Sequence, residues 1–342
     1  MALTTGMINA QVQKGAFRPH TGLSNMALAY FQNASNYFAK AIFPICRVQQ
    51  SSDAYYIFNK EDLLRDGWQR KPEYGTVTPA VVSEHTETYR CQVDQMRMHI
   101  SDIRTTDLQR RMGPSLARDP RQMRTKVIAE QANIHQDRLF AEQFFKAGVW
   151  ANELTGVDTT TTNSGEFIKF SNGNSDPIKF IAEQKRAVQQ STGRTPNKLA
   201  MGVNVFDALT VHPGILDRIK YGGTTANPAN VTENVLAQLF GVEELVVLQS
   251  IHNQAKQGAE ADMEFIGDPN AMLLAYATDA PSTDEPSAGY IFTWDMLGDG
   301  QILPIFHYPG EQGTHTEWVE GLMAYDMKKT ADDLAVFCKD VV

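Results

Sequence analysis

The sequence predicts a mixed α+β fold with two lobes, and three observations lead to this prediction. The chain has 342 residues, more than the ~250–300 residues at which a single hydrophobic core stops growing. A strand pattern interrupted by a charged stretch runs from 53 to 100, and a long helical pattern follows from Asp119 to about Lys146. Helical and strand patterns then alternate between 176 and 280, which is typical of a compact α/β lobe.

The overall charge is acidic, with a formal net charge of -9 and a sequence pI of about 5.4. Proteins that grip nucleic acid by its phosphates usually carry a basic surface, so a tight, direct nucleic-acid ligand is not expected. Basic residues do cluster locally, at Arg104, Arg110, Arg111, Arg118, Arg121 and Arg124. We interpret this cluster as a solvated or subunit-facing patch, with nucleic-acid contact as the alternative.

The cysteines Cys46, Cys91 and Cys338 are far apart and odd in number, so they suggest no disulfide framework or zinc site. A reducing compartment fits this pattern best. The sequence has no apolar run of about 18 residues, the minimum for a membrane span. Its start, MALTTGMINAQVQKG, lacks the basic and apolar regions of a signal peptide. We therefore expect the protein to stay in the cytoplasm where it is made.

The first hundred residues predict an extended arm followed by a long hairpin. Residues 1–21 are polar and weakly patterned, and residues 23–43 place apolar side chains at helical spacing until Pro44 stops the helix. Residues 53–59 (DAYYIFN) are strand-like, 60–80 are charged with few core-type side chains, and 81–100 alternate again. The alternation puts Val93, Gln95, Arg97 and His99 on one face and Asp94, Met96, Met98 and Ile100 on the other. A hairpin tip without a core must pack on another molecule or stay mobile.

Two Asp-Pro pairs predict helix starts, because Asp is a good N-cap and Pro suits the first helical position. Asp119-Pro120 opens the longest helix, on which Met123, Val127, Ile134 and Ala141 recur on one face. Asp176-Pro177 opens a second helix, which should end at Gly193. The Thr-, Asn-, Ser- and Gly-rich residues 155–175 between the two helices suggest a linker.

The rest of the chain predicts short strands and capped helices. Asn204 and Thr232 can cap helices over 205–211 and 233–240, the second of which should end at Gly241. The predicted strands cover 198–203, 244–249, 272–277, 289–294, 302–307 and 316–325, with a final one near the C-terminus. An exposed polar loop is expected at 308–317.

No catalytic motif is present: the sequence has no GxSxG, HExxH, GxxxxGK[ST] or complete GxGxxG. The fragment Gly298-Asp299-Gly300 lies between two strands and is interpreted as a turn. Two groups of histidines and acids are candidate metal or catalytic sites: Glu84, His85 and Glu87, and Glu311, His315, Glu317 and Glu320. We interpret both groups as surface or intersubunit contacts, and His135 as a partly buried structural residue. We therefore predict no catalytic site, no metal site and no cofactor site.

The order of these features resembles the major capsid proteins of tailed bacteriophages, which have the Hong Kong 97-type fold. The most specific stretch is RTPNKLAMGVNVFDALTVHPGILDRIKYG (194–222), which resembles the family's A-domain. FAKAIFPICRV (38–48), YYIFNKEDLLRDGWQRKPEYGTV (55–77), ETYRCQVDQMRMHISD (87–102) and EGLMAYDMKKTADDLAVFCKDVV (320–342) resemble its arm junction, E-loop, returning strand and closing strands. The likeness covers nearly the whole chain from about residue 20.

The resemblance implies a division of the chain into an N-terminal arm at 1–49 and an E-loop hairpin at 50–90. It implies a P-domain at 91–175 and 281–320, with a long spine helix near 120–147, and an A-domain at 176–280 and 321–342. The implied function is a structural subunit without catalysis, which assembles into hexamers and pentamers of an icosahedral phage head around double-stranded DNA. The implied location is the virion capsid, assembled in the host cytoplasm.

The resemblance also implies contacts and partners. Expected subunit contacts are Lys60, Arg65, Trp68, Arg70, Lys71, Glu73 and Tyr74 in the E-loop, Tyr30, Phe31, Tyr37 and Phe38 in the arm, and Glu311, His315 and Glu317 in the P-domain loop. For the arm aromatics, packing on their own subunit is the alternative. Implied partners are further copies, a separate scaffolding protein, a portal protein, a decoration protein where one is used, and DNA through weak non-specific contact. The chain starts with a short arm, which suggests little or no maturation cleavage.

Three other interpretations stay open. An encapsulin-like cellular compartment would have the same fold, and a cargo enzyme encoded nearby would favour it. A metal-dependent α/β hydrolase would require a closed pocket in which histidines and carboxylates converge. A tail-tube protein would be shorter and more wholly β than this chain, which has several capped helices.

Overall fold

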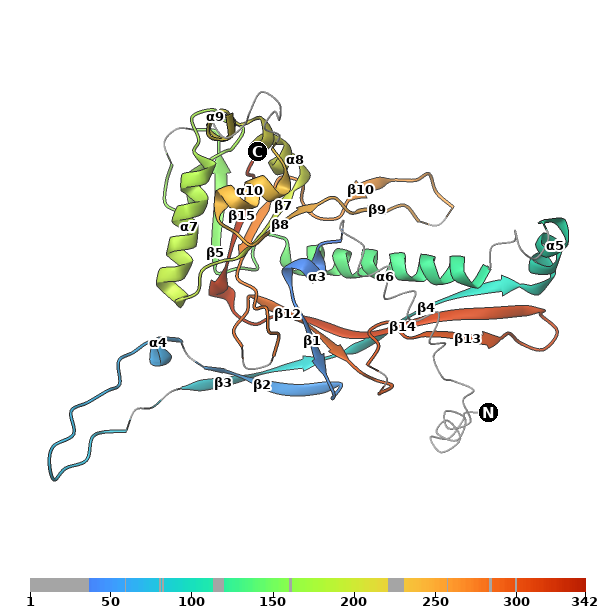
Figure 1. Ribbon diagram of the computed structural model, residues 1–342, viewed down its shortest axis with the longest axis horizontal. Coiled ribbons are helices and arrows are strands. Elements are labelled where there is room, and N and C mark those ends of the chain that lie inside the picture. Colours follow the sequence, from blue (N-terminus) through green and yellow to red (C-terminus); the bar gives the residue numbers. More distant parts are fainter. Residues whose placement is uncertain are drawn as a thin grey trace.

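A five-stranded sheet with one long helix along it adjoins a lobe built on a six-stranded sheet, and two hairpins project from this body (Figure 1). The computed structural model describes residues 37–58, 60–79, 81, 83–112, 120–159, 162–220, 231–256, 258–282, 285–298 and 300–342. The arm expected at 1–21 and most of the helical stretch expected at 23–43 therefore lie outside the described residues.

The five-stranded sheet runs along the length of the molecule. Its order is β1 (Ile45–Val48), β12 (Gly289–Trp294), β14 (Thr316–Lys329) and β13 (Ile305–Pro309), and β4 (Gln92–Ser101) also pairs with β14. β14 is long enough to pair with β12 near its C-terminal end and with β4 and β13 nearer its start. The boundary expected between residues 320 and 321 thus falls inside one continuous strand.

The alternation predicted for β4 is confirmed, because each face of the strand meets a different environment. Met96 and Met98 pack against the main core and Ile100 is buried, whereas Arg97 and His99 on the other face are exposed. The predicted strand at 81–100 is split at Cys91, since β3 (Glu84–Arg90) turns away to pair in the first hairpin.

The long helix α6 (Pro120–Phe144) packs across this sheet, and α5 (Asp102–Met112) precedes it. The predicted start at Pro120 is confirmed, and the predicted apolar face is confirmed in part: Ile134 and Ala141 pack partly buried against the main core, whereas Met123 is 55% exposed. The face that packs inward consists of Thr125, Ile128, Ala129, Ala132, Asn133, Gln136, Asp137, Phe140 and Phe144. Hydrophobic periodicity misses such a face, because nearly half of its side chains are polar.

The six-stranded sheet forms the α/β lobe. Its order is β6 (Glu166–Ile168), β5 (Asn152–Val157), β15 (Ala335–Lys339), β11 (Met272–Ala275), β7 (Lys198–Gly202) and β8 (Glu244–Leu248). Its helices are α7 (Pro177–Thr192), α8 (Val203–Val211), α9 (Pro213–Lys220) and α10 (Glu233–Phe240), and a short 3-10 turn, η1 (Asp332–Leu334), precedes β15.

The linker expected at 155–175 is wrong, because part of this segment adds two parallel strands to the lobe. β5 pairs with β15, β6 pairs with β5, and Phe167 of β6 is buried. The polar composition is tolerated because β6 is an edge strand of only three residues.

The predicted caps of the lobe helices are largely confirmed. The Asp176 Oδ1 accepts the N–H of Lys179 at 3.0 Å, and Gly193 ends α7 in the left-handed conformation at φ 74°. Thr232 accepts the N–H of Val235 at 3.4 Å, and Gly241 ends α10 in the same left-handed way. Asn204 is not a cap: α8 starts at Val203 directly after β7.

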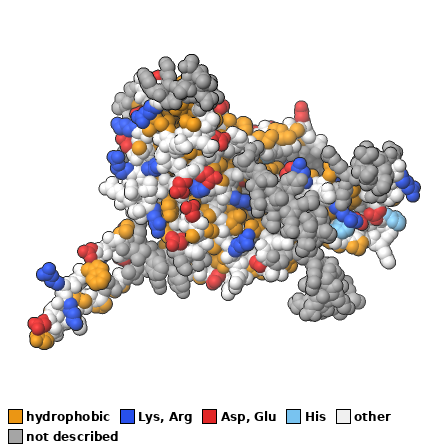
Figure 2. Space-filling view, in the orientation of Figure 1, with side chains coloured by type: hydrophobic (Ala, Val, Ile, Leu, Met, Phe, Trp, Pro, Cys, Tyr) orange, Lys and Arg blue, Asp and Glu red, His pale blue; other side chains and the backbone are white. Residues whose placement is uncertain are grey.

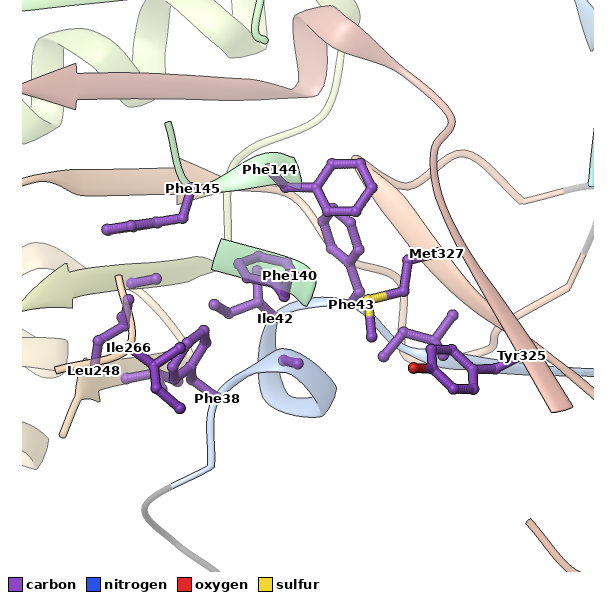
Figure 3. Close-up of a cluster of buried hydrophobic side chains, with 14 of the residues drawn as sticks. Phe38, Ile42, Phe43, Phe140, Phe144, Phe145, Leu248, Ile266, Tyr325 and Met327 are labelled. Carbon is purple, nitrogen blue, oxygen red and sulfur yellow. The ribbon is translucent and has the colours of Figure 1, made fainter. Parts of the chain in front are cut away.

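A cluster of aromatic residues joins both sheets to the start of the described chain (Figure 3). The one-turn helix α3 (Ala39–Ile42) lies between Phe38 and Phe43, both fully buried. The ring of Phe43 meets that of Phe140 edge-on, with centroids 4.8 Å apart. Leu248 and Ile266 belong to the same core. The residues 37–43 are thus an integral part of the core.

The two hairpins leave this body in different directions (Figure 1). β2 (Ser52–Phe58) pairs with β3, with the one-turn helix α4 (Lys60–Leu63) in the connection, and β9 (Ile251–Asn253) pairs with β10 (Met263–Phe265).

None of the helices in the described ranges combines the length and apolar character needed to cross a lipid bilayer.

Candidate subunit interfaces

The base of the β2–β3 hairpin is anchored in a small core of its own. Tyr55 and Tyr89, on opposite strands, are buried against Phe292 of β12. The rings of Tyr89 and Phe292 stack with centroids 4.6 Å apart, and the Tyr55 hydroxyl donates to Glu87 at 2.9 Å. Burial, followed by this hydrogen bond, raises the pKa of Tyr55. The direction of the hairpin is therefore fixed at its root.

The tip of this hairpin carries large apolar side chains with almost no cover. Trp68 is 94% exposed, Tyr74 95%, Val81 80% and Leu64 64%. In Figure 2 the β2–β3 hairpin stands clear of the body and carries hydrophobic and charged side chains along its length. Aromatic side chains contribute much of the energy of protein interfaces, so Trp68 and Tyr74 are well placed to contact another molecule.

Charged residues surround these aromatics, and one contact braces the loop. Arg65, Arg70, Lys71 and Glu73 are all exposed at the tip, as expected. Asp62 accepts hydrogen bonds from the hydroxyl and the N–H of Ser83, which lower the pKa of the Asp62 carboxyl. This contact ties the two sides of the loop together near its base. The side chain of Lys60 lies outside what the structure describes.

The arm aromatics divide into three cases. Tyr30 and Phe31 lie outside the described residues, and Tyr37 is half-buried. Phe38 is 0% exposed, with its ring 5.8 Å from that of Phe140. A contact from Phe38 to a neighbouring subunit is therefore excluded, and for this residue the alternative, packing on its own subunit, is the correct one.

In the 308–317 loop, Glu311 and His315 are exposed, whereas Glu317 is engaged within its own chain. Arg121 of α6 holds the Glu317 carboxylate with contacts of 2.9 Å to both oxygens, and His307 of β13 lies 2.9 Å from Oε2. Burial raises the pKa of Glu317, but the bonds from His307 and Arg121 outweigh it, so the pKa is lowered overall. Glu317 thus fastens the start of α6 to the sheet.

The histidine and acid groups weighed as metal sites do not converge among the described residues, where no set of three or more His, Cys, Asp or Glu could hold an ion. Glu87 accepts a hydrogen bond from the Tyr55 hydroxyl, and Glu320 accepts hydrogen bonds from Tyr308 at 2.5 Å and from Gln95 at 2.6 Å. His135 pairs with Asp94 at 3.2 Å, in keeping with a partly buried structural role.

Sequence reasoning missed the β9–β10 hairpin altogether. Its strands have three residues each, and Ile251, Met263 and Phe265 are between 44% and 63% exposed. The signal in the sequence was weak, because Ile251 is the one large apolar residue of the first strand and a polar, alanine-containing tip separates it from Met263 and Phe265.

No protein-family model matches the sequence. The segment that matches a curated protein is 32% identical over 88 residues to the major capsid protein of Burkholderia phage BcepMu. This match spans 26% of the present chain and only 27% of that protein.

Solved structures match over nearly the full length. A phage-related protein from Bordetella bronchiseptica superimposes with a TM-score of 0.69 at 19% identity, covering 95% of this chain and 98% of its own. The capsid of cyanophage P-SCSP1u reaches 0.52 at 10% identity, covering 86% and 85%, and an encapsulin of Synechococcus elongatus reaches 0.51 at 10%, covering 91% and 89%. The chain has the fold of capsid and encapsulin shell proteins.

Proposed function

We propose that the protein is the major capsid protein of a tailed bacteriophage, a structural subunit without a catalytic role that assembles into a closed shell. The observation that carries this proposal is the β2–β3 hairpin. It is anchored at its base yet presents Trp68 and Tyr74 to solvent at 94% and 95%, in a chain with a shell-protein fold. Large exposed apolar side chains on a projecting hairpin are typical of a site that binds another molecule, not of a protein that acts as a monomer.

The parts of the fold suit the division implied by the sequence. The β2–β3 hairpin corresponds to the E-loop, α6 with the five-stranded sheet to the P-domain, and the six-stranded sheet with its helices to the A-domain. In this proposal the A-domain starts at β5, near residue 152, rather than at 176. The P-domain keeps the whole of β14.

In this proposal the hairpin tip supplies both the binding energy of the contact with a neighbouring copy and the side chains that fix its position. Trp68 and Tyr74 would bury apolar surface on a neighbouring copy, and the mixed charges Arg65, Arg70, Lys71 and Glu73 would set the position of the contact. Exposed ion pairs contribute only ~0–1 kcal/mol each, so the aromatics carry most of the affinity. Many such moderate contacts repeated around a shell give a stable assembly.

The curated match favours a phage head over a cellular compartment. Encapsulins share the fold at similar TM-scores, so the fold alone does not separate the two functions. The segment at 32% identity belongs to a phage major capsid protein, and this is the observation that tips the choice. A scaffolding protein, a portal and a decoration protein would be the further partners in a phage head.

Electron microscopy tests the proposal directly. The full chain is expressed alone and together with its neighbouring genes, and the purified material is examined by negative stain. Closed shells, tubes or hexameric rings are expected. A uniform oligomer smaller than a pentamer under both conditions would overturn the proposal, and copurification of an enzyme inside the shells would favour the compartment.

A further inference from the structure

The side chain of Lys40 reaches from the one-turn helix α3 to a carboxamide on the long helix α6. Its Nζ donates a hydrogen bond to Oδ1 of Asn133 at 2.7 Å, between residues 93 positions apart in the sequence. Asn133 is 3% exposed. Lys40 is partly buried, and its neighbours Ala39 and Ile42 are each 1% exposed. A primary amine thus contacts an amide group at a place shielded from bulk water.

Burial makes this amine a better nucleophile. It lowers the pKa of Lys40 to about 7, although the charge of Asp137 opposes the change. Near pH 7 about half of the Lys40 side chains therefore carry a neutral amine, which can attack a carbonyl carbon. Desolvation of this kind is one of the ways in which lysine is activated as a nucleophile in proteins.

Asp137 positions the lysine and can move its proton. It lies one turn along α6 from Asn133, on the same buried face. Its carboxylate accepts the N–H of Ala39, the residue before Lys40, at 3.0 Å. Burial raises the pKa of Asp137 to about 6, although its hydrogen bonds oppose the rise. A carboxyl group with this pKa can accept a proton from a nearby amine and return it near neutral pH.

Aromatic packing holds the two helices in a fixed relation. Phe38 and Phe43, on either side of α3, lie with their ring centroids 5.8 and 4.8 Å from that of Phe140 on α6 (Figure 3). All three rings are 0% exposed. The amine and the amide are therefore held together by the fold, and such proximity greatly accelerates a reaction between two groups.

We propose that Lys40 and Asn133 react to form an amide bond between their side chains, with release of ammonia. The Lys40 Nζ attacks Cγ of Asn133, the carbon bonded to the oxygen that it already contacts, and a new C–N bond forms. Asp137 takes a proton from Nζ and delivers it to Nδ2 of Asn133, so that the Cγ–Nδ2 bond breaks and ammonia leaves. The atoms balance without an oxidant or a further reactant.

The reaction occurs once in each folded subunit and is not turnover of a substrate, so it does not depend on the proposed function. The bond joins the start of the described chain covalently to the middle of α6. It closes a loop that spans 93 positions and contains the whole β2–β3 hairpin. A covalent link across such a loop restricts the unfolded chain, as a disulfide does, and thereby stabilises the fold.

Mass spectrometry of the full chain tests the bond. The denatured wild-type protein should be lighter than its sequence by one molecule of ammonia. Trypsin should then release a branched product in which residues 15–47, uncut at Lys40, are joined to residues 127–138. Lys40→Arg should show its full mass and no branched product. Gln131→Ala, on the exposed face of α6, is the control and should be linked like wild type.

A second variant tests the proton transfer. Asp137→Asn keeps an acceptor oxygen for the N–H groups but cannot carry the proton, so its linked fraction should fall at least about tenfold while circular dichroism shows a folded chain. Linking as in wild type would overturn the role of Asp137.

Two results would overturn the bond itself. One is a wild-type chain of full mass, with residues 127–138 recovered as a separate peptide, which would leave only a hydrogen bond between Lys40 and Asn133. The other is loss of ammonia without the branched product, which would indicate cyclisation of an asparagine instead. Both results can be obtained whether or not the chain forms shells, so they are distinct from a failure of the proposed function.

Discussion

The carboxylate of Asp137, in the middle of α6, accepts the N–H of Ala39 at 3.0 Å. It also accepts the N–H of Phe38 at 3.2 Å and the hydroxyl of Ser250 at 3.0 Å. These partners come from the start of the described chain and from the segment directly after β8, so one buried side chain joins three parts of the fold. Burial raises the pKa of Asp137 to about 6, although the hydrogen bonds oppose the rise.

Removing this carboxylate should destabilise the subunit strongly. Asp137→Ala leaves two buried N–H groups without an acceptor, and we expect a loss of about 2–4 kcal/mol in the free energy of unfolding. Asp137→Asn keeps one acceptor oxygen and should cost about 1–2 kcal/mol. Urea denaturation of dispersed subunits measures both, with Gln131→Ala on the exposed face of α6 as the control. Equal stability of Asp137→Ala and the control would contradict this role.

The raised pKa of Asp137 also predicts how stability depends on pH. Between the ordinary carboxyl value of 3.8 and about 6, the folded chain holds a proton on Asp137 that the unfolded chain has released. Asp137 therefore contributes stability that is present below pH 3.8 and lost as the pH rises through about 6. The difference in unfolding free energy between wild type and Asp137→Asn should shift against wild type by about 1–3 kcal/mol from pH 4 to 7. A constant difference across this range would contradict it.

The sequence was sufficient to predict those features that depend on one side chain and the backbone next to it. Asp176 and Thr232 cap helices because their side chains reach an N–H three residues on. The alternation in β4 was readable because one face of the strand packs on the core and the other meets solvent. These are local rules, and tertiary contacts reinforce them here.

The sequence was not sufficient to predict which residues are buried where polar groups from distant parts of the chain meet in the core. The polar part of the inward face of α6 could not be recognised, because Asn133 and Asp137 find their hydrogen-bond partners more than 90 residues away. These partners are Lys40, Phe38, Ala39 and Ser250. The same reason explains the error at Phe38. Its aromatic character fits an interface or a core equally well, and the contact with α6 that decides between them is long-range.

The site was likewise predictable only in part. The exposed tip of the β2–β3 hairpin was anticipated, because a charged stretch between two strand patterns has no core of its own. The β9–β10 hairpin was not, because strands of three residues leave too short a pattern to recognise.

A glycine in β14 should prove essential to the packing of α6 on the sheet. A Cβ added at Gly321 would lie 2.5 Å from Ile128 Cγ2, closer than such atoms approach. Ile128 is 1% exposed and has little room to move, so Gly321→Ala should destabilise the subunit by about 1–3 kcal/mol. Gly173→Ala is the matched control, since an added Cβ there meets nothing within 4 Å. Thermal unfolding compares the two, and equal midpoints would show that the sheet yields to the methyl group.

The exposed tryptophan of the β2–β3 hairpin separates assembly from folding. Because Trp68 is 94% exposed, Trp68→Ala should leave the unfolding free energy of dispersed subunits within about 0.5 kcal/mol of wild type. If the indole is buried on a neighbouring copy, its loss should weaken that contact by about 2 kcal/mol, which is ~30-fold in affinity, and the yield of shells should fall accordingly. Sedimentation of expressed shells measures the yield. Leu297→Ala, 42% exposed in the turn after β12, is the control, and equal shell yields from both variants would remove Trp68 from the interface.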